Sequence, residues 1–360
     1  MAENSFTFDL NQFLSTTLLN YRTKSGVMYD NVFKSNPTFY FMHEKGRKNF
    51  YYGGERIIVP LQYGKNSTVQ NYSRYDPIDT TPQDNQTAAY YEIMQKSASI
   101  VIDGKSLRQN SGKFQLINLL KTKTGESEDS LSEEIGEDLW RITPETDAIF
   151  SIPSIVPLAP GTTDAATPGG IDGTAKAWWN NQSKQSVGTT WSMIVAEMRN
   201  LYNTCSKGNK KNAGGPPDFA VADQGSYEYV ENHMATKERY IDADSIGGKA
   251  RSVGFENIRF KNCNLFWDEF IPDAYGDGTT GYDSLAINAS SDWKYGSIYF
   301  LNSKFMNYTV DVATDLKIGK FRTPHNQDAK IAPILHYHQL TCSNRAKQGV
   351  LHHITQGYTA

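Results

Sequence analysis

Four histidines near the end of the chain are the side chains best suited to metal chemistry. His336 and His338 lie two residues apart and therefore on one face of an expected strand, and His352-His353 lies in the strand expected to pair with it. Neutral imidazoles from neighbouring strands can hold a transition metal. No carboxylate or supporting hydrogen-bond partner accompanies them, and histidine pairs on surface strands more often face solvent. We therefore predict no metal site here.

A second candidate is a run of acids in the second half of an expected helix over residues 112–141. The seven carboxylates belong to Glu126, Glu128, Asp129, Glu133, Glu134, Glu137 and Asp138. Paired carboxylates act as general acid and base, or as cation ligands, only in a concave site, and nothing nearby supplies one. A run of like charges more often marks the solvated face of a helix. The favoured interpretation is a long helix that lies across a surface.

The motifs that usually carry catalysis are missing. The sequence contains no Gly-rich phosphate loop ending in Gly-Lys-Ser/Thr, no Gly-x-Ser-x-Gly elbow, no His-Glu-x-x-His pair and no Cys-x-x-Cys. The loop around Asp273 and Asp277 lacks the alternating oxygens of a calcium-binding EF-hand. We therefore expect a structural protein that is not an enzyme and needs no cofactor.

The cysteines and the net charge exclude further classes of protein. Cys205, Cys263 and Cys342 are odd in number and widely spaced, which favours three reduced thiols over a disulfide framework or a zinc site. A formal net charge of -3 and a pI of about 6.2 argue against a dedicated nucleic-acid-binding protein. The sequence shows neither a secretory signal nor an apolar run long enough to span a bilayer, so we expect no membrane partner.

One long hairpin dominates the first third of the chain. Ile57, Val59, Leu61 and Tyr63 alternate with Arg56, Pro60 and Gln62, which predicts a strand with one covered face. Residues 64–87 are polar and carry Val69 and Ile78 as their only aliphatics beyond alanine, and residues 90–102 form a return strand. A polar loop of this length is usually functional or disordered. An arm with an apolar root and a polar tip is typical of a segment that lies on another subunit.

Two helices and one aromatic pair stand out in the middle of the chain. Apolar residues at helical spacing, with Gly125 in a polar middle, predict the helix over 112–141, and a second stripe predicts one over 191–205. The second helix has Thr189 or Thr190 as N-cap and Gly208 as its stop. Between the helices, residues 151–186 are rich in Pro and Gly and should form turns. Trp178-Trp179 within them could stack on a base or sugar, but we favour buried anchors at a subunit or lobe contact.

The second half of the chain is typical of an α+β fold. The expected elements are a strand over 218–222, a helix over 227–240, an extended stretch over 253–270, a strand-forming stretch over 297–312, and a closing pair over 331–341 and 349–355 joined by polar residues 342–348. The lysines Lys207, Lys210 and Lys211 form a small basic loop that we interpret as a solvated turn. No internal repeat is evident.

Several of these segments follow one another in an order typical of a known family. They are Asp30-Asn-Val-Phe-Lys-Ser-Asn-Pro37, Gly53-Gly-Glu-Arg-Ile-Ile-Val-Pro-Leu-Gln-Tyr-Gly64, Tyr75-Asp-Pro-Ile-Asp-Thr-Thr-Pro82, Asn110-Ser-Gly-Lys113, Gly169-Gly-Ile171 with Trp178-Trp-Asn180, and the closing strands. Over essentially its whole length the chain resembles a tailed-phage major capsid protein of the Hong Kong 97-type fold. The resemblance rests on a pattern of segments and carries no catalytic fingerprint.

The resemblance implies an α+β fold with an N-terminal arm, an extended β-hairpin loop (the E-loop), a long spine helix, and peripheral and axial domains. The implied divisions are an arm over 1–48, the E-loop over 49–102, a peripheral domain with the spine helix over 103–213, an axial domain over 214–328, and C-terminal peripheral strands over 329–360. The resemblance also implies inter-subunit contacts, for which the candidates are Arg56, Tyr63, Tyr72, Tyr75, Trp178 and Trp179.

The function that the resemblance implies is that of a container. The chain would form hexamers and pentamers of an icosahedral shell, assembled in the host cytoplasm and retained in the virion. Because no scaffolding segment fits before the arm, a separate scaffold protein is implied, together with a portal and decoration proteins. Packaged double-stranded DNA would be held without sequence readout, with Arg22 and Lys24 of the arm as candidate contacts. Some members of the family form Lys–Asn isopeptide bonds, but Lys65 offers no matched acceptor and acid, so crosslinking is not among our predictions.

Two other functions compete with this one. The abundance of Tyr, Asn and Gly suits a β-rich phage tail component or surface binding protein, but a long central helix and the lack of repeats argue against it. A metal-dependent hydrolase would use the C-terminal histidines and the acidic helix, and it lacks any supporting motif.

Overall fold

The computed structural model describes residues 36–44, 48–109, 119–142, 144–161, 167–187, 190–207, 215–235, 258–271 and 296–354. Most of the predicted N-terminal arm, the start of the long helix, and the loop over 273–282 lie outside these residues. The chain divides into two compact units. Unit 1 comprises Met1–Lys34, Gln95–Glu134 and Ala313–His336, and unit 2 comprises Ser35–Met94, Ile135–Val312 and Tyr337–Ala360.

Unit 2 is built on a six-stranded mixed sheet with the order β5-β13-β9-β6-β8-β7. The strands are β5 (Gln182–Gln185), β13 (Gly349–Ile354), β9 (Gly296–Leu301), β6 (Phe219–Ala222), β8 (Cys263–Trp267) and β7 (Ile258–Phe260). Every residue of β6 and β9 is buried. Such unbroken apolar strands are expected where both faces of a sheet are covered.

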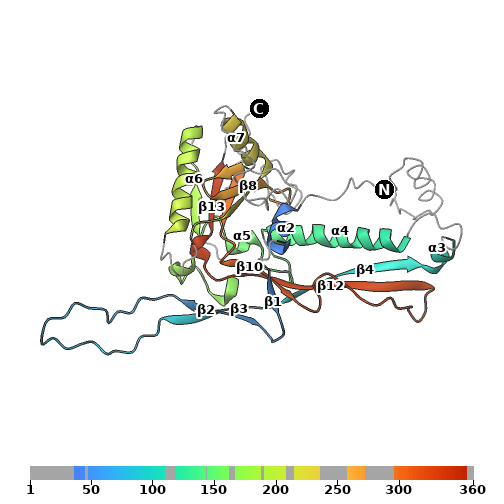
Figure 1. Cartoon of the computed structure of the whole chain (residues 1–360), viewed down its shortest axis with the longest axis horizontal. Coiled ribbons are helices and arrows are strands. Elements are labelled where there is room, and N and C mark those ends of the chain that lie inside the picture. The colour runs from blue at the N-terminus through green and yellow to red at the C-terminus, as the bar shows by residue number, and fades with distance from the viewer. Residues whose placement is uncertain are drawn as a thin grey trace. The chain divides into compact units, whose positions relative to one another are not determined.

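Helices α6 (Trp191–Ser206) and α7 (Gln224–Ala235) cover one face of this sheet (Figure 1). The predicted stripe of α6 is confirmed, because Ile194, Met198, Leu201 and Cys205 are all buried. The helix follows Thr190, whose side chain makes no capping hydrogen bond, and ends at Ser206, one residue before its C-cap. It packs tightly on β13, since a Cβ on Gly349 would lie 2.6 Å from the Cys205 Sγ.

Helix α7 begins at Gln224, three residues before the predicted start at Tyr227. The reason is Asp223, whose carboxylate accepts a hydrogen bond from the backbone N–H of Ser226, in the manner of an N-cap. The other oxygen of the same carboxylate accepts from the N–H of Ser297 on β9. Asp223 therefore ties the start of the helix to the sheet.

Unit 1 contains part of a second sheet. In it β12 (Ala329–Cys342) pairs with both β4 (Met94–Asp103) and β11 (Lys317–Ile318). Burial alternates along β4, as expected of a strand with one covered face, and Ile100 and Ile102 are its buried positions. Helix α3 (Gly104–Gln109) follows β4. The Lys96 Nζ donates a hydrogen bond to the carbonyl of Glu134, which joins β4 to the long helix α4 (Leu119–Trp140).

The long helix largely follows its prediction. Leu131, Ile135 and Leu139 are buried on one stripe, while most of the acids are exposed or half-buried. Asp138 differs, because it is buried. The last turn of α4 is closely packed in unit 2, where a Cβ on Gly136 would lie 2.3 Å from the Asn36 side-chain nitrogen. A helix with this much contact at one end cannot present all seven carboxylates to solvent.

The predicted closing pair is wrong. Strand β12 pairs with β10 (Met306–Asp311), which also pairs with β1 (Asn49–Tyr51), whereas β13 lies between β5 and β9 in the other sheet. The connection between them holds the short helix η6 (Arg345–Lys347) and ends at Gln348, whose side chain bonds the backbone of Asn302 in both directions. That tie directs β13 to the sheet that contains β9.

The two histidine pairs are therefore on different sheets. His336 and His338 on β12 are buried, so the expectation that they face solvent is wrong. The Tyr308 hydroxyl on β10 and the His338 Nδ1 form a hydrogen bond. His352 is on β13, where burial lowers the pKa of its imidazole to about 4. The paired strands on which the metal alternative depended do not exist.

Two other predictions need smaller corrections. The return strand is interrupted at Glu92 and Ile93 into β3 (Gln86–Tyr91) and β4, where the carbonyl of Glu92 accepts a hydrogen bond from the Gln339 side chain. The turn-rich region contains the short helices α5 (Ile152–Ile155), η2 (Pro168–Gly170) and η3 (Ala177–Trp179).

A buried carboxylate joins three distant segments of unit 2. The Asp268 carboxylate, just after β8, accepts hydrogen bonds from the backbone N–H (3.2 Å) and hydroxyl of Thr38 in α2 (Pro37–Glu44). It also accepts from the Trp140 Nε1–H (3.2 Å) and the N–H of Phe270 (3.0 Å). Burial raises the pKa of Asp268 to about 6, although these donors favour the ionised form.

This site predicts a pH dependence of stability. The unfolded carboxyl has a pKa of about 3.9, so the folded state releases its proton at higher pH. Stability from Asp268 is therefore fully present below pH 4 and falls as pH rises to about 7, by about 3 kcal/mol. The difference in free energy of unfolding between the wild type and Asp268→Asn should follow this curve in urea titrations. Trp140→Phe removes a donor that favours the ionised form, so it should raise the pKa of Asp268 further and enlarge the total loss. A pH-independent difference would contradict the assignment.

Candidate interaction site

The hairpin of β2 (Ile57–Gln62) and β3 has two different faces. Its antiparallel register places Ile57 opposite Tyr91 and Val59 opposite Ala89 on the inner face. On the outer face Ile58 lies opposite Tyr90, and these side chains are 62% and 49% exposed. A two-stranded sheet has only marginal stability by itself. It is therefore unusual for it to leave an apolar cross-strand pair exposed to solvent.

The inner face packs on the segment around Trp179. This tryptophan is 2% exposed, its indole N–H donates to the carbonyl of Pro168 (3.1 Å), and the Arg345 guanidinium lies 5.9 Å from its ring centre. Leu61 and Ala89 complete the cluster. Trp179 is thus an anchor within its own chain, and its role between subunits stays a prediction.

A glycine allows the backbone to approach β3 closely. Gly169 has φ +71°, and a Cβ there would lie 2.7 Å from the Ala89 Cβ and 3.2 Å from the Tyr91 hydroxyl. The Tyr91 hydroxyl donates to the carbonyl of Cys342 (2.8 Å) and accepts from its N–H (3.3 Å). Burial raises the pKa of Tyr91 far above its ordinary value, so the hydroxyl keeps its proton and this bond.

The polar loop, defined as residues 63–85, begins on a second aromatic contact. The Tyr63 ring stacks on Trp178, with centroids 5.3 Å apart and an interplanar angle of 22°. Its hydroxyl donates to the carbonyl of Asp84 (2.7 Å), and its N–H donates to the carbonyl of Asn85. Trp178 is half-buried. These bonds close the base of the loop.

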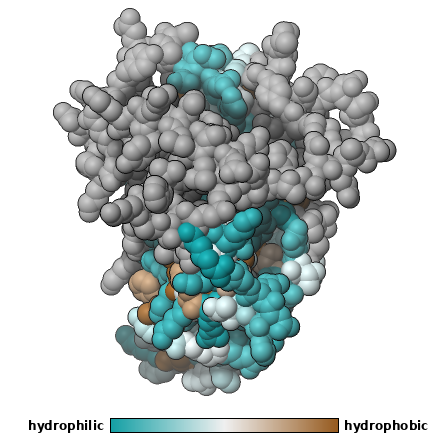
Figure 2. Space-filling model, turned by 90° about the vertical axis from the view of Figure 1, so that its right-hand side faces the viewer, coloured by the Kyte–Doolittle hydropathy of each residue, from teal (hydrophilic) through white to brown (hydrophobic). Residues whose placement is uncertain are grey.

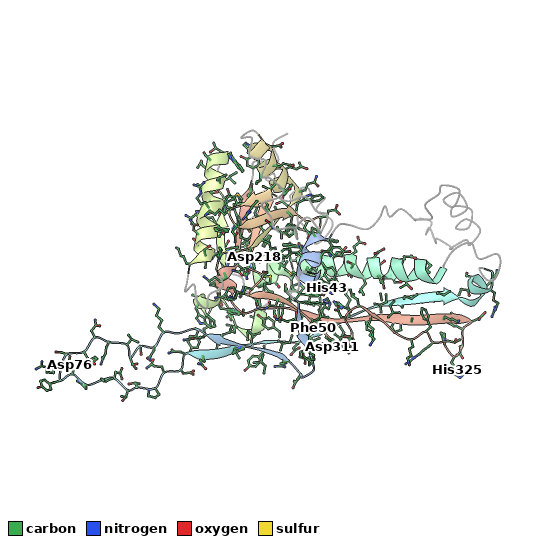
Figure 3. The ribbon with its side chains drawn as sticks, in the orientation of Figure 1. His43, Phe50, Asp76, Asp218, Asp311 and His325 are labelled. Carbon is green, nitrogen blue, oxygen red and sulfur yellow. The ribbon has the colours of Figure 1, made fainter. Side chains whose placement is uncertain are left out.

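Side chains join the two limbs of the polar loop. The Ser67 hydroxyl donates to the Gln83 side chain (2.8 Å), and the Gln70 amide donates to the carbonyl of Pro77 (3.1 Å). At the tip, the Asp76 carboxylate accepts from the N–H of Ser73 (2.8 Å). Figure 3 shows Asp76 at the far end of the loop. The loop is thus organised by polar contacts and has no apolar core.

The apolar side chains of the polar loop are exposed. The large ones are Tyr63 (42%), Val69 (82%), Tyr72 (66%), Tyr75 (92%) and Ile78 (65%). Arg56 at the hairpin base forms an ion pair with Glu92 (2.9 Å), and both side chains are at least half exposed.

The site residues predicted from sequence therefore fall into two groups. Arg56, Tyr63, Tyr72 and Tyr75 lie on the outside, whereas the Trp178-Trp179 pair supports the root.

Sequence reasoning gave no role to three residues that contribute to this site. Ile58 and Tyr90 form the exposed pair, and strand alternation could have identified them, because their neighbours are the inward residues. Gly169 supports the root, and only its place in Pro-Gly-Gly marks it in the sequence.

The described residues were compared with the requirements for a metal site, a membrane-spanning helix and a reactive thiol. Within them, no group of three or more His, Cys, Asp or Glu side chains could hold a metal ion. No helix in the described ranges combines the length and apolar character that a bilayer crossing requires. All three cysteines are free and buried, and burial raises the pKa of Cys205 and Cys342 to about 12. Both thiols therefore stay protonated at neutral pH.

Comparison with known proteins identifies the fold. No protein-family model matches the sequence, and no curated protein matches it. Solved structures do. A chain of the capsid asymmetric unit of cyanophage A-1(L) is 14% identical with a TM-score of 0.62, covering 92% of this chain and 96% of that one. A chain of the capsid of the native GTA particle is 11% identical with a TM-score of 0.56, and the match covers 91% of this chain and 93% of that one. A chain of the capsid of Myoviridae phage XM1 is 9% identical with a TM-score of 0.53, and the match covers 91% of this chain and 95% of that one. The chain has the mixed helix-and-sheet fold of these capsid structures.

The root contact can be tested with a pair of neighbouring glycines. Gly169 and Gly170 have φ +71° and +72°, but nothing lies within 4 Å of a Cβ on Gly170. Gly170→Ala should cost about 1 kcal/mol for the left-handed backbone alone. Gly169→Ala should cost about 1–3 kcal/mol more, because the Cβ overlaps β3. Urea unfolding measures both, and equal losses would contradict the close contact.

Proposed function

We propose that this chain is the major capsid protein of a tailed double-stranded DNA bacteriophage. It would self-assemble into hexamers and pentamers of an icosahedral shell that encloses the genome, with the Hong Kong 97-type fold. The observation that carries the proposal is the hairpin: its root is fixed within the chain, while its outer face and polar loop expose apolar side chains. Likeness to three capsid structures over more than nine-tenths of each chain supports it.

We assign the parts of the chain as the sequence predicted. The arm would span 1–48, the E-loop 49–102, the peripheral domain with its spine helix 103–213, the axial domain 214–328 and the C-terminal strands 329–360. Pairing of β4 with β12 supports a peripheral sheet built from segments that lie far apart in the sequence. The six-stranded sheet of unit 2 also contains β5 and β13, which lie outside residues 214–328. The axial domain therefore shares strands with its neighbours in sequence.

Contact between subunits would use the outside of the hairpin. Tyr72 and Tyr75 in the polar loop and Ile58 with Tyr90 on the outer face offer apolar area that becomes buried only against another molecule. Arg56 and Tyr63 lie at the edge of this surface. Closed symmetric assemblies bury such area repeatedly with one contact type. This role is structural and requires no catalysis.

The remaining partners follow from a container function. A separate scaffold protein would guide assembly in the host cytoplasm, and a portal and decoration proteins would complete the virion. DNA would be held through weak, salt-sensitive phosphate contacts without sequence readout, because the net charge of -3 provides little overall attraction. Arg22 and Lys24 remain candidates for these contacts and lie outside the described residues.

Assembly itself is the first test. The purified chain, with its scaffold partner present, should form closed shells or rings of five and six subunits in negative-stain micrographs, because its exposed apolar surface is repeated on every copy. Sedimentation velocity gives the same information in solution. A chain that stays monomeric at high concentration with scaffold present would count against a capsid.

Protection of the polar loop is the second test. Amides of residues 64–85 should exchange quickly in the isolated subunit and slowly in the shell, since polar contacts hold the loop until a neighbour covers it. The sequence predicted this behaviour for residues 64–87, but residues 86 and 87 belong to strand β3. The buried strand β9 provides an internal control whose protection should remain high in both states. Equal protection of the loop in the subunit and the shell would show that it has no partner.

A further inference from the structure

A lysine occupies a turn position at which lysine is costly. Strands β7 and β8 pair antiparallel with Phe260 opposite Cys263, so Lys261 and Asn262 form a two-residue turn. Lys261 has φ +55°, in the left-handed region that Gly and Asn adopt at such turns with less strain. A bulky residue held in this region points to a use for its side chain. The turn thus keeps a lysine where asparagine would be more stable.

The Lys261 side chain is held against α6. Its Nζ donates a hydrogen bond to the Asn203 side-chain oxygen (2.7 Å) and lies 4.5 Å from the centre of the Tyr202 ring. Arg199 is one turn before Asn203 on the same face of the helix, which brings its positive charge near this amine. The Arg259 Nε–H on β7 donates to the carbonyl of Lys261 (3.2 Å). Three cations therefore meet at one turn.

The basic cluster, defined as Arg199, Arg259 and Lys261, is not neutralised by the acids of the described chain. None of its side-chain nitrogens has a carboxylate oxygen within 4 Å among those residues. Partial burial and then the Arg199 cation lower the pKa of the Lys261 amine, whereas a nearby carboxylate would raise it. The Asp218 carboxylate, at the same end of the sheet, accepts hydrogen bonds from the N–H (2.9 Å) and hydroxyl of Ser303. The positive charge of the cluster thus remains available to a ligand.

Unpaired charge alone does not make a binding site. Figure 2 shows a side of the molecule whose described surface is mainly hydrophilic, so exposed polar residues are common. In unit 1, for example, the exposed lysines Lys317 and Lys320 make no side-chain hydrogen bond within the described chain. The basic cluster differs, because hydrogen bonds and a ring contact hold the side chains of Arg259 and Lys261. Such preorganisation reduces the conformational entropy that is lost when a ligand binds.

The described surface around the basic cluster is polar. The exposed large hydrophobic side chains of the described chain all lie outside residues 199–207 and 258–263. The exposed neighbours of the cluster are Asn200, Asn203 and Lys207 on and after α6, and Asn262 in the turn. A protein interface normally has an apolar centre, whereas phosphate groups are bound by Arg, Lys and Asn side chains through charge-assisted hydrogen bonds. The surroundings therefore favour phosphate over another protein as the ligand.

We propose that the basic cluster binds backbone phosphates of the packaged double-stranded DNA. This inference rests on the proposed function, and it adds a contact site in unit 2 to the arm residues Arg22 and Lys24. Arginine can bind a phosphate through two parallel hydrogen bonds, and Lys261 adds a positive charge at a fixed position. Three cations give each copy a weak contact that does not depend on sequence, and repetition over the copies of a shell strengthens it.

The salt dependence of DNA binding tests this contact in the full-length chain. Fluorescence anisotropy measures the binding of a short labelled duplex of mixed sequence over a range of NaCl concentrations. The slope of log K against log salt should shrink by about 0.9 for each of Arg199→Gln, Arg259→Gln and Lys261→Asn, because each change removes one phosphate contact. Lys184→Gln removes an exposed lysine from β5, at the opposite edge of the same sheet, and should leave the slope unchanged. Equal slopes for the wild type and all three cluster variants would overturn the proposal.

Stability separates a binding role of Lys261 from a structural one. Asparagine adopts the left-handed region more readily than lysine, so Lys261→Asn should unfold at the same or a higher urea concentration than the wild type while it binds DNA less tightly. Loss of binding without loss of stability supports the phosphate contact. A lower urea midpoint with unchanged DNA affinity would show that Lys261 serves only the packing of the turn on α6, and this result would contradict the proposal.

Two further outcomes would identify a different ligand and refute the DNA contact. If the cluster variants bind DNA normally but no longer assemble, the basic cluster meets an acidic surface of a second copy. If inorganic phosphate displaces the duplex where chloride of equal ionic strength does not, the site holds the free anion. Because binding is measured on subunits, a failure of the wild type to form shells would count against the proposed function and would leave the DNA result standing.

Discussion

The close approach between Gly169 and β3 is the constraint on which the hairpin depends. A two-stranded sheet is only marginally stable by itself. Its root therefore needs another segment of the chain packed directly against it. Gly169 provides that approach, Trp179 fills the space beside it, and the Tyr91 hydroxyl bonds both backbone groups of Cys342. With the root fixed, the polar loop can extend without an apolar core of its own.

Elsewhere in unit 2, buried polar side chains also hold distant segments together. Asp268 joins α2, α4 and the turn after β8, Asp223 joins α7 to β9, and Gln348 joins the turn before β13 to Asn302. Each tie connects residues far apart in sequence, and each uses a side chain with two acceptors or with a donor and an acceptor. Hydrophobic burial alone is non-directional, so these bonds select which segments meet.

Local patterns predicted local structure well. The alternation of Ile57, Val59 and Leu61 and the stripe of α6 are properties of a few adjacent residues, and the structure confirms both. Pairing between distant strands could not be predicted in this way. Strands β12 and β13 are adjacent in sequence and each is strand-forming, yet the Gln348 tie separates them into different sheets. For the same reason the burial of His336 and His338 was missed. Of the candidate site, the exposed tyrosines followed from composition, whereas Gly169 acts through φ and a contact that a sequence does not show.

The position of β13 has a consequence for the order of synthesis. This strand lies between β5 and β9, although its residues are made after all the other strands of its sheet. Until residues 349–354 leave the ribosome, β5 has no strand partner among the described residues and the β9 edge is open. An edge of that kind invites pairing with other chains. Strand β13 therefore completes the six-stranded sheet of unit 2, and a chain that stops before residue 349 would expose the β9 edge. Correct pairing of that edge thus depends on a strand that follows it by about fifty residues in the sequence.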